Sequence, residues 1–246
     1  MDQRFSYLLY LPRGLKADSI ERPRLLVAVH DTFRDMYQLR HQFKEFANQT
    51  NTVVLLPVFP CGIEDREDLH NYKFILYHGI RFDLILKDMI EEVRECFRLT
   101  DQILMYGFSG GAQFIHRYLY LHPENISDAV IVAPGRITFL DPEEDYYCGI
   151  HDFEKFFGQS FNMTALKKIR VLLMVGTDDT EEIDYAAEGD FAPAIGKFGK
   201  NRLERVRALF ENYRENGMDA YLKELPGISH EAEKAVSSAI SFYLHT

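Results

Sequence analysis

The chain has 246 residues, of which 46% are hydrophobic and 27% are charged. That composition is typical of a folded globular protein and excludes an intrinsically disordered chain. Lys and Arg number 28 and Asp and Glu number 38, which gives a net charge of −10 at pH 7. The acidic balance argues against nucleic acid or an anionic membrane surface as the main partner. The length fits one large domain, so we expect residues 1–246 to form a single domain.

The chain shows no sign of a membrane span or of secretion. No apolar run approaches the roughly 18 residues that a membrane-spanning helix needs, and the N-terminal residues lack the features of a signal peptide. The three cysteines, Cys61, Cys96 and Cys148, form no CxxC pair, which excludes a disulfide scaffold and fits a reducing compartment. We therefore expect a cytoplasmic protein without a membrane partner, and the sequence leaves its oligomeric state open.

Short apolar runs alternate with longer segments of helical periodicity along the chain. The apolar runs predict strands at 7–11, 25–29, 53–56, 103–106, 129–132, 171–175 and, more weakly, 220–222. Apolar residues recur with a period near 3.6 in the segments 39–47, 82–97, 203–213 and 232–243. This alternation predicts an α/β fold with a mostly parallel sheet and helices on both of its faces.

One long segment, residues 136–165, interrupts the alternation of strands and helices. It has no long periodic face but is rich in aromatic residues, namely Phe139, Tyr146, Tyr147, Phe153, Phe156, Phe157 and Phe161. An insertion of this size in a compact domain is more often functional than not, so we expect an aromatic cap or lid over the site. In that case Tyr146, Tyr147 and Phe153 would contact the substrate. The alternative is a satellite hydrophobic cluster that packs a long loop.

The strongest motif is Gly107-Phe108-Ser109-Gly110-Gly111, which follows a predicted buried strand and precedes a helical pattern. In that context G-x-S-x-G is typical of a nucleophile elbow, a turn so sharp that the residues around the serine must be small. The alternative is a turn of small residues that packs a helix onto a strand. The spacing of the glycines does not fit the G-x-G-x-x-G pattern of a dinucleotide turn.

A nucleophilic serine needs a base and an acid that orients it, and in this kind of fold both follow the serine in the chain. Of the histidines after Ser109, His230 lies in a loop between the last predicted strand and the last helix, which is the position that a base requires. The acid should follow the preceding strand, where Asp178 and Asp179 both qualify. Either aspartate could instead be a turn residue that bonds its own backbone.

The tetrahedral intermediate of acyl transfer also needs two backbone N–H donors. One is expected from Gly110, the residue after the serine, and the other from Thr32, in the loop after the strand at 25–29. His30 and Asp31 could be read as a metal-binding pair, but further ligands at suitable spacing are not visible, so we expect no metal.

Together these motifs resemble the α/β-hydrolase fold, in particular small esterases similar to polyhydroxybutyrate depolymerases. The resemblance covers nearly the whole chain and rests on five segments, namely Tyr10-Leu11-Pro12, His30-x-x-x-Arg34-Asp35, Gly107-Phe108-Ser109-Gly110-Gly111, Gly176-x-x-Asp179 and Gly227-Ile228-Ser229-His230. It implies Asp179 rather than Asp178 as the acid. One departure is Asp31, because the group commonly has glycine after the histidine of the oxyanion loop.

The resemblance implies hydrolysis of a small carboxylic ester or lactone through an acyl-enzyme, without a metal or an organic cofactor. Ser109, His230 and Asp179 would be catalytic, Thr32 and Gly110 would bind the oxyanion, and Phe33 and Phe108 would join the aromatic cap in contacting substrate. Two alternatives remain open. One is cleavage of a C–C bond next to a carbonyl, and the other is a hydrolase-like receptor that binds a small molecule with little turnover.

Overall fold

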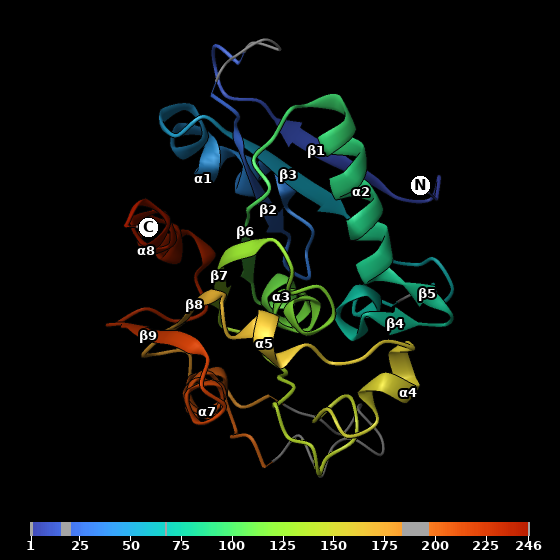
Figure 1. The fold of residues 1–246 in the computed structure, drawn as a ribbon. Coiled ribbons are helices and arrows are strands. Elements are labelled where there is room, and N and C mark those ends of the chain that lie inside the picture. The colour runs from blue at the N-terminus through green and yellow to red at the C-terminus, as the bar shows by residue number, and fades with distance from the viewer. Residues whose placement is uncertain (1, 16–20, 67, 184–196, 246) are drawn as a thin grey trace.

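A computed structural model describes residues 2–15, 21–66, 68–183 and 197–245. Its centre is a seven-stranded sheet with the strand order β1-β3-β2-β6-β7-β8-β9 (Figure 1). The strands are β1 (Ser6–Tyr10), β2 (Arg24–Val29), β3 (Thr52–Val58), β6 (Ile103–Phe108), β7 (Ile126–Val132), β8 (Arg170–Gly176) and β9 (Asp219–Leu225). Only β1 runs antiparallel to its neighbour in this sheet. The prediction of a mostly parallel sheet is confirmed, and each predicted strand overlaps one of these seven.

Burial explains why most strands were visible in the sequence. Strands β6 and β8 lie inside the sheet and are buried along almost their whole length, so they consist of continuous apolar runs. Strand β9 is at the sheet edge and alternates between buried and exposed side chains. Its three-residue apolar signal was correspondingly weak.

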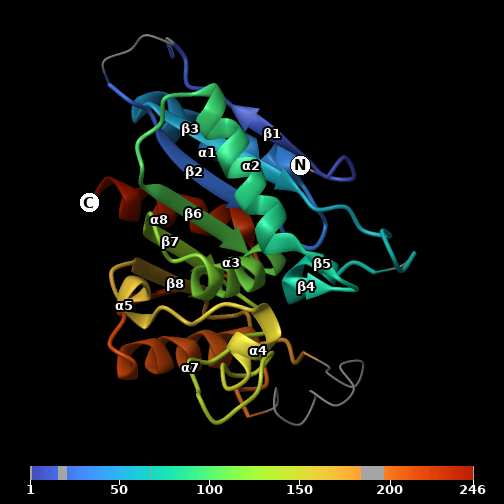
Figure 2. The ribbon, with the colours of Figure 1, turned by 45° about the vertical axis from the view of Figure 1, so that its right-hand side comes forward.

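Helices cover both faces of the sheet, as predicted (Figures 1 and 2). Helices α1 (Met36–Gln49) and α8 (Ala232–Leu244) lie side by side on one face, where the ring of Phe46 packs against that of Tyr243. Helices α2 (Phe82–Cys96), α3 (Gly110–Leu121) and α7 (Arg202–Glu215) lie on the other. There the buried Tyr120 hydroxyl of α3 donates to the Tyr213 hydroxyl of α7 at 3.0 Å.

Several short elements were not predicted, because two to five residues are too few to show a period. They are the 3₁₀ helix η1 (Asn71–Phe74), the paired strands β4 (Leu76–Tyr77) and β5 (Ile80–Arg81), and the short helices α4 (Phe153–Phe157) and α5 (Met163–Leu166). Strands β2 and β6 point toward the side of the molecule that carries β4, β5 and α4 (Figure 2). These unpredicted elements therefore matter for a site at the carboxyl edge of the sheet.

Within residues 136–165 the aromatic rings pack against one another. Tyr146, Phe153 and Phe157 are each less than 10% exposed, and their ring centroids lie 4.7 to 6.3 Å apart. Phe139 and Phe161 are partly buried, and Phe156 is 41% exposed. The segment thus contains a small hydrophobic cluster of its own.

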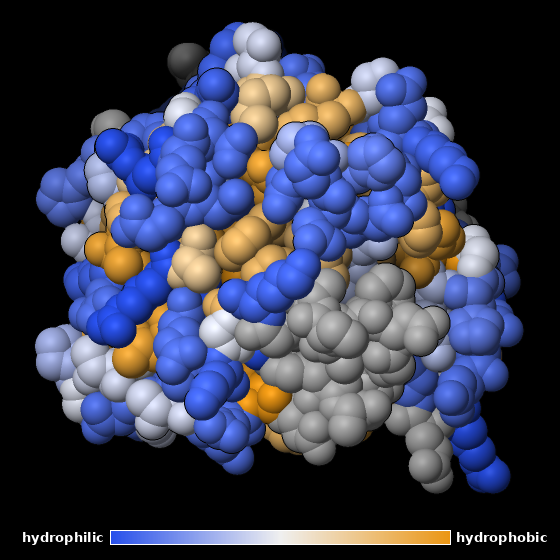
Figure 3. Space-filling model, turned by 90° about the horizontal axis from the view of Figure 1, so that it is seen from below, coloured by the Kyte–Doolittle hydropathy of each residue, from blue (hydrophilic) through white to orange (hydrophobic). Residues whose placement is uncertain are grey.

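The face of the molecule that is seen from below, relative to the view of Figure 1, is mainly hydrophilic (Figure 3). Apolar side chains appear there as small patches between hydrophilic ones (Figure 3). Within the described ranges, no helix combines the length and apolar character needed to cross a membrane.

Candidate active site

Ser109 sits in the sharp turn between β6 and α3, with φ 52° and ψ −110°, a left-handed backbone conformation that costs energy for any residue but glycine. The turn is held by the Ser109 N–H, which donates to the Val132 carbonyl at 2.8 Å. A Cβ atom on Gly107 would lie 2.4 Å from the Gly111 carbonyl carbon, and one on Gly111 would lie 2.2 Å from the Val29 oxygen. Both contacts are with backbone that cannot move aside, so the turn has the strain and the small neighbours of a nucleophile elbow.

The structure brings Ser109, His230 and Asp179 into one hydrogen-bonded row. His230 Nε2 lies 3.0 Å from Ser109 Oγ, and His230 Nδ1 lies 2.7 Å from Asp179 Oδ2. The turn after β8 and the loop before α8 meet closely, because a Cβ on Gly176 would lie 2.0 Å from the Ile228 oxygen. Glycine at position 176 thus permits the approach of the acid turn to the histidine loop.

The neighbouring Asp178 does not take part in this row. Its side chain is exposed, its N–H donates to the Ile228 carbonyl at 2.9 Å, and its carboxylate accepts from the Thr177 hydroxyl at 3.1 Å. Asp179 is only 2% exposed. Of the two candidates, Asp179 is the one whose carboxylate reaches His230.

Asp179 is also paired with Arg202, a residue that the sequence analysis did not single out. Arg202 donates to Asp179 Oδ1 at 3.1 Å from the first turn of α7. Burial would raise the pKa of Asp179, but the hydrogen bonds and charges of His230 and Arg202 outweigh it and keep the pKa below its usual value. An ionised Asp179 accepts a hydrogen bond from the Nδ1–H of His230, which leaves His230 Nε2 as the acceptor that faces the Ser109 hydroxyl.

The two expected oxyanion donors lie next to each other. A Cβ on Gly110 would be 3.1 Å from the Thr32 nitrogen and 2.3 Å from the Tyr72 hydroxyl. In the part of the chain that the structure describes, neither amide donates to a protein acceptor. Gly110 opens α3, so its amide also lies at the positive end of the helix dipole. The pair has the features of an anion site.

Asp31, the departure from the resembling group, folds back onto its own loop. Its Oδ1 accepts from the N–H of Phe33 at 2.9 Å and from the N–H of Arg34 at 3.1 Å. Arg34 then donates to the Thr32 carbonyl at 2.6 Å. Asp31 and Arg34 together hold the loop that carries the Thr32 amide.

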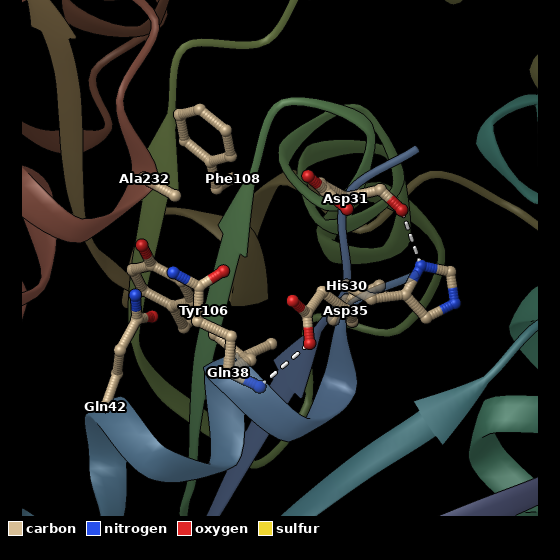
Figure 4. A pocket seen from close by; sticks show the side chains of 10 residues that line it. His30, Asp31, Asp35, Gln38, Gln42, Tyr106, Phe108 and Ala232 are labelled. Carbon is tan, nitrogen blue, oxygen red and sulfur yellow. Dashed lines mark hydrogen bonds between the residues drawn. The ribbon is translucent and has the colours of Figure 1, made fainter. Parts of the chain in front are cut away.

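His30 has no free nitrogen for a metal. Its Nδ1 lies 2.7 Å from the Asp31 carbonyl (Figure 4). Its Nε2 accepts from the Phe59 N–H at 3.2 Å. Burial lowers the pKa of His30 to about 3, so the ring is neutral. No group of three or more metal-ligating side chains occurs among the residues outside the gaps.

Phe108 lies beside the histidine, with its ring centroid 4.5 Å from that of His230. It also lines a pocket of about 30 Å³ between α1 and the ends of β2 and β6, where the buried Tyr106 hydroxyl and Gln42 Nε2 have no protein partner (Figure 4). Phe33 projects from the oxyanion loop and is 87% exposed. Of these two phenyl rings, only that of Phe108 contacts a residue of the hydrogen-bonded row among the ring contacts of the described residues.

The other expected substrate contacts belong to the aromatic segment 136–165. Tyr146 and Tyr147 line a pocket of about 320 Å³, mostly apolar, together with Phe74, Leu76, Tyr77, His78 and Phe156. Phe153 does not line this pocket and is 1% exposed. Ser109 and His230 are likewise absent from its wall. Sequence reasoning missed the contributions of η1 and β4 because the segment 71–77 carries no periodic pattern.

Comparison with known proteins shows which solved structures have a similar fold. No family model matches the chain, and no curated protein matches it in sequence. Among solved structures, poly(aspartic acid) hydrolase-1 from Sphingomonas sp. KT-1 is similar, with a TM-score of 0.76 and 20% identity over 96% of this chain and 92% of that one. A poly(3-hydroxybutyrate) depolymerase from Bordetella parapertussis also has a TM-score of 0.76, with 19% identity over 98% of this chain and 84% of that one.

An S-formylglutathione hydrolase from Agrobacterium tumefaciens is more distant, with a TM-score of 0.63 and 14% identity over 98% of this chain and 88% of that one. Identities this low carry information on the fold alone. The sheet order, the helices on both faces and these similarities lead to one conclusion. The chain has the α/β-hydrolase fold.

Proposed function

We propose that the protein is a serine hydrolase that cleaves a small carboxylic ester or lactone through an acyl-enzyme. The observation that carries the proposal is the hydrogen-bonded row from Ser109 through His230 to Asp179 at the carboxyl edge of the sheet. A turn that holds its serine in a strained conformation supports it. A merely structural turn would not need a histidine and a buried carboxylate in line with the hydroxyl.

The proposed reaction proceeds in two halves. His230 Nε2 takes the proton of Ser109 Oγ as the oxygen attacks the carbonyl carbon, while Asp179 stabilises the imidazolium that forms. The carbonyl oxygen becomes negative and accepts hydrogen bonds from the amides of Thr32 and Gly110. His230 then gives its proton to the leaving alcohol, and a water activated by the same histidine hydrolyses the acyl-enzyme. No step needs a metal or an organic cofactor.

For substrate contacts, we propose Phe33 and Phe108 at the elbow and Tyr146 and Tyr147 in the aromatic pocket. The pocket wall is mostly apolar, which suits an alkyl or aromatic group of the ester. We further propose that residues 136–165 act as a cap in one domain with the rest of the chain. Phe153, which is buried among neighbouring rings, would support the cap from within rather than touch substrate.

The direct test is turnover of p-nitrophenyl acetate and butyrate combined with labelling by a fluorophosphonate. A hydrolase should show both burst-phase turnover and covalent labelling. A receptor of the same fold should bind ligand without turnover. If the protein turned over only substrates that are cleaved at a C–C bond beside a carbonyl, the proposed reaction would be C–C bond hydrolysis instead of ester hydrolysis.

Replacing Ser109 with Ala should lower kcat by ~10⁴–10⁶, because the nucleophile is removed while the rest of the site remains. Fluorophosphonate labelling should disappear in the same variant. Circular dichroism and a melting curve would check that the fold is kept. Ester hydrolysis near the wild-type rate in purified Ser109→Ala protein would contradict the assignment.

The two adjacent aspartates should respond very differently to replacement by asparagine. Asp179→Asn keeps the shape but favours the wrong imidazole tautomer, a change that cost ~10⁴ in kcat in the serine-protease precedent. Asp178→Asn is the matched control and should stay within about tenfold, or ~1.4 kcal/mol. Steady-state kinetics of both variants decide, and a larger loss in Asp178→Asn would move the role to that residue.

Asp31 should be needed as a hydrogen-bond acceptor rather than as a charge. Asp31→Ala removes the acceptor for two loop amides and should lower kcat roughly tenfold, since each lost hydrogen bond frees a loop that holds Thr32. Asp31→Asn keeps an oxygen at that position and should retain most of the activity. If Asp31→Ala were as active as the wild type, the loop would not depend on this side chain.

The aromatic pocket predicts a change in substrate preference when Phe156 is shortened. Phe156 is 41% exposed, so Phe156→Ala should leave the melting temperature nearly unchanged. It should raise KM for long or aromatic acyl chains more than for acetate, by roughly three- to tenfold, because apolar contact area is lost. Tyr221→Ala, at an exposed aromatic of β9, is the control. Equal kinetics across the panel would exclude the pocket from substrate binding.

A further inference from the structure

Lys73 is a buried lysine beside the two proposed oxyanion donors. It belongs to η1, and its side chain is 2% exposed, which is unusual for lysine. A Cβ on Gly110 would lie 2.7 Å from Lys73 Cε and 3.1 Å from the Thr32 nitrogen. The end of the lysine chain, the start of α3 and the Thr32 backbone are therefore packed against one another.

The ammonium group is held by neutral partners. Lys73 Nζ donates to Thr32 Oγ1 at 2.7 Å and lies 2.6 Å from Nδ1 of His70. Burial, together with the charge of Lys73, lowers the pKa of His70 to about 4, so this ring is neutral and can accept. Within the described ranges, no carboxylate comes within 4.0 Å of Lys73 Nζ. Its positive charge is not neutralised by a direct ion pair.

The backbone around Lys73 is fixed by other buried groups. The Lys73 carbonyl accepts from the guanidinium of Arg117 at 2.8 Å, and Arg117 is fully buried on α3. Asn71, in the same 3₁₀ helix, ties η1 to two other segments. Its side chain donates to the Pro60 carbonyl at 2.9 Å and accepts from Arg34 at 3.3 Å. A lysine that is this firmly placed keeps its charge at one position relative to the Thr32 and Gly110 amides.

We propose that Lys73 is a positioning residue of the oxyanion hole. Lys73 holds the Thr32 loop by its hydrogen bond to Thr32 Oγ1 and keeps a positive charge beside the Thr32 and Gly110 amides. This inference rests on the proposed function. A negative charge appears on the carbonyl oxygen only as the transition state is reached, so a fixed positive charge beside it stabilises that state more than the bound substrate. Loss of Lys73 should therefore lower kcat and leave KM nearly unchanged.

The charge of Lys73 is expected to titrate near neutral pH. Burial lowers the pKa of Lys73 to about 7, and the charges of Arg136 and Arg34 lower it while those of Asp31 and Asp68 act in the opposite direction. The wild-type kcat should fall as pH rises above about 7, because the ammonium loses its proton. The pKa of Lys73 is 10.5 in the unfolded chain, so between pH 7 and 10.5 the unfolded chain binds more protons at this group than the folded chain does. The stability of the folded state should therefore rise with pH across this range.

The experiment compares the whole chain carrying Lys73→Met, Lys73→Gln or Lys87→Met with the wild type, using p-nitrophenyl butyrate between pH 6 and 9. Met matches the apolar stem, Gln keeps a donor for Thr32 without the charge, and exposed Lys87 on α2 is the control for the net-charge change. We expect kcat to fall roughly 10- to 100-fold at pH 6 in both position-73 variants, with KM within about threefold. The decline of kcat above pH 7 should disappear in both.

Melting curves separate this role from a structural one. Lys73→Met should melt at least as high as the wild type near pH 7, because a buried ammonium is removed, and its pH dependence of stability should be flatter. Three outcomes would each overturn the proposal. The first is that the kcat of the wild type shows no decline above pH 7, the second is that both position-73 variants keep the kcat of the wild type, and the third is that their loss of activity only follows a lower melting temperature. Absence of both turnover and fluorophosphonate labelling in the wild type would instead refute the proposed function, and Lys73 would still alter the pH dependence of the melting temperature.

Discussion

The close approach of α3 to the end of β2 is the contact on which the candidate site depends. Gly111 lies so near the Val29 and His30 carbonyls that any side chain would collide with backbone. This contact brings the start of α3 against the loop that follows β2. As a result Gly110 lies next to the Thr32 backbone nitrogen, although 78 positions separate the two residues in the sequence. The strained conformation of Ser109 is stable because the sheet and the helix on either side fix it.

A second close contact sets the other half of the site. The turn after β8 approaches the loop before α8 at Gly176, where the Ile228 carbonyl leaves no room for a Cβ atom. Asp178 N–H donates to the same carbonyl, so one residue of the turn ties the two loops together. The next residue, Asp179, then points inward to His230 and Arg202. Adjacent aspartates thus have separate tasks, one in the backbone junction and one in the buried charge pair.

Much of this arrangement could be predicted because it rests on features that are local in sequence. Buried central strands such as β6 and β8 are continuous apolar runs, and the elbow carries its glycines within five residues. The position of His230 followed from chain order. The choice of Asp179 over Asp178 needed the resemblance, since alternation along a turn does not tell which side chain is buried.

What the sequence could not predict depends on contacts between distant segments. The direction of the Asp31 side chain was open in the sequence, and in the structure its Oδ1 accepts from two amides of its own loop. The aromatic segment 136–165 gave no means of telling buried Phe153 from exposed Phe156, because both belong to one short helix and differ only in which neighbours they meet. Lys73 lies in a four-residue helix without a periodic signal, so its burial became visible only in three dimensions.

Charge is distributed unevenly between the surface and the site. The chain carries a net charge of −10, yet Arg34, Lys73 and Arg117 are gathered behind the proposed oxyanion hole. In the described part of the chain, all three donate to carbonyl, hydroxyl, amide or imidazole acceptors and none forms an ion pair with a carboxylate. Neutral acceptors satisfy the hydrogen bonds of a buried cation without cancelling its charge, and burial reduces screening by water. Lys73 and Arg117 are buried and Arg34 is partly buried, so they leave a positive potential where the proposed acyl transfer would develop its negative charge. Lys73 contributes to this potential while it is protonated.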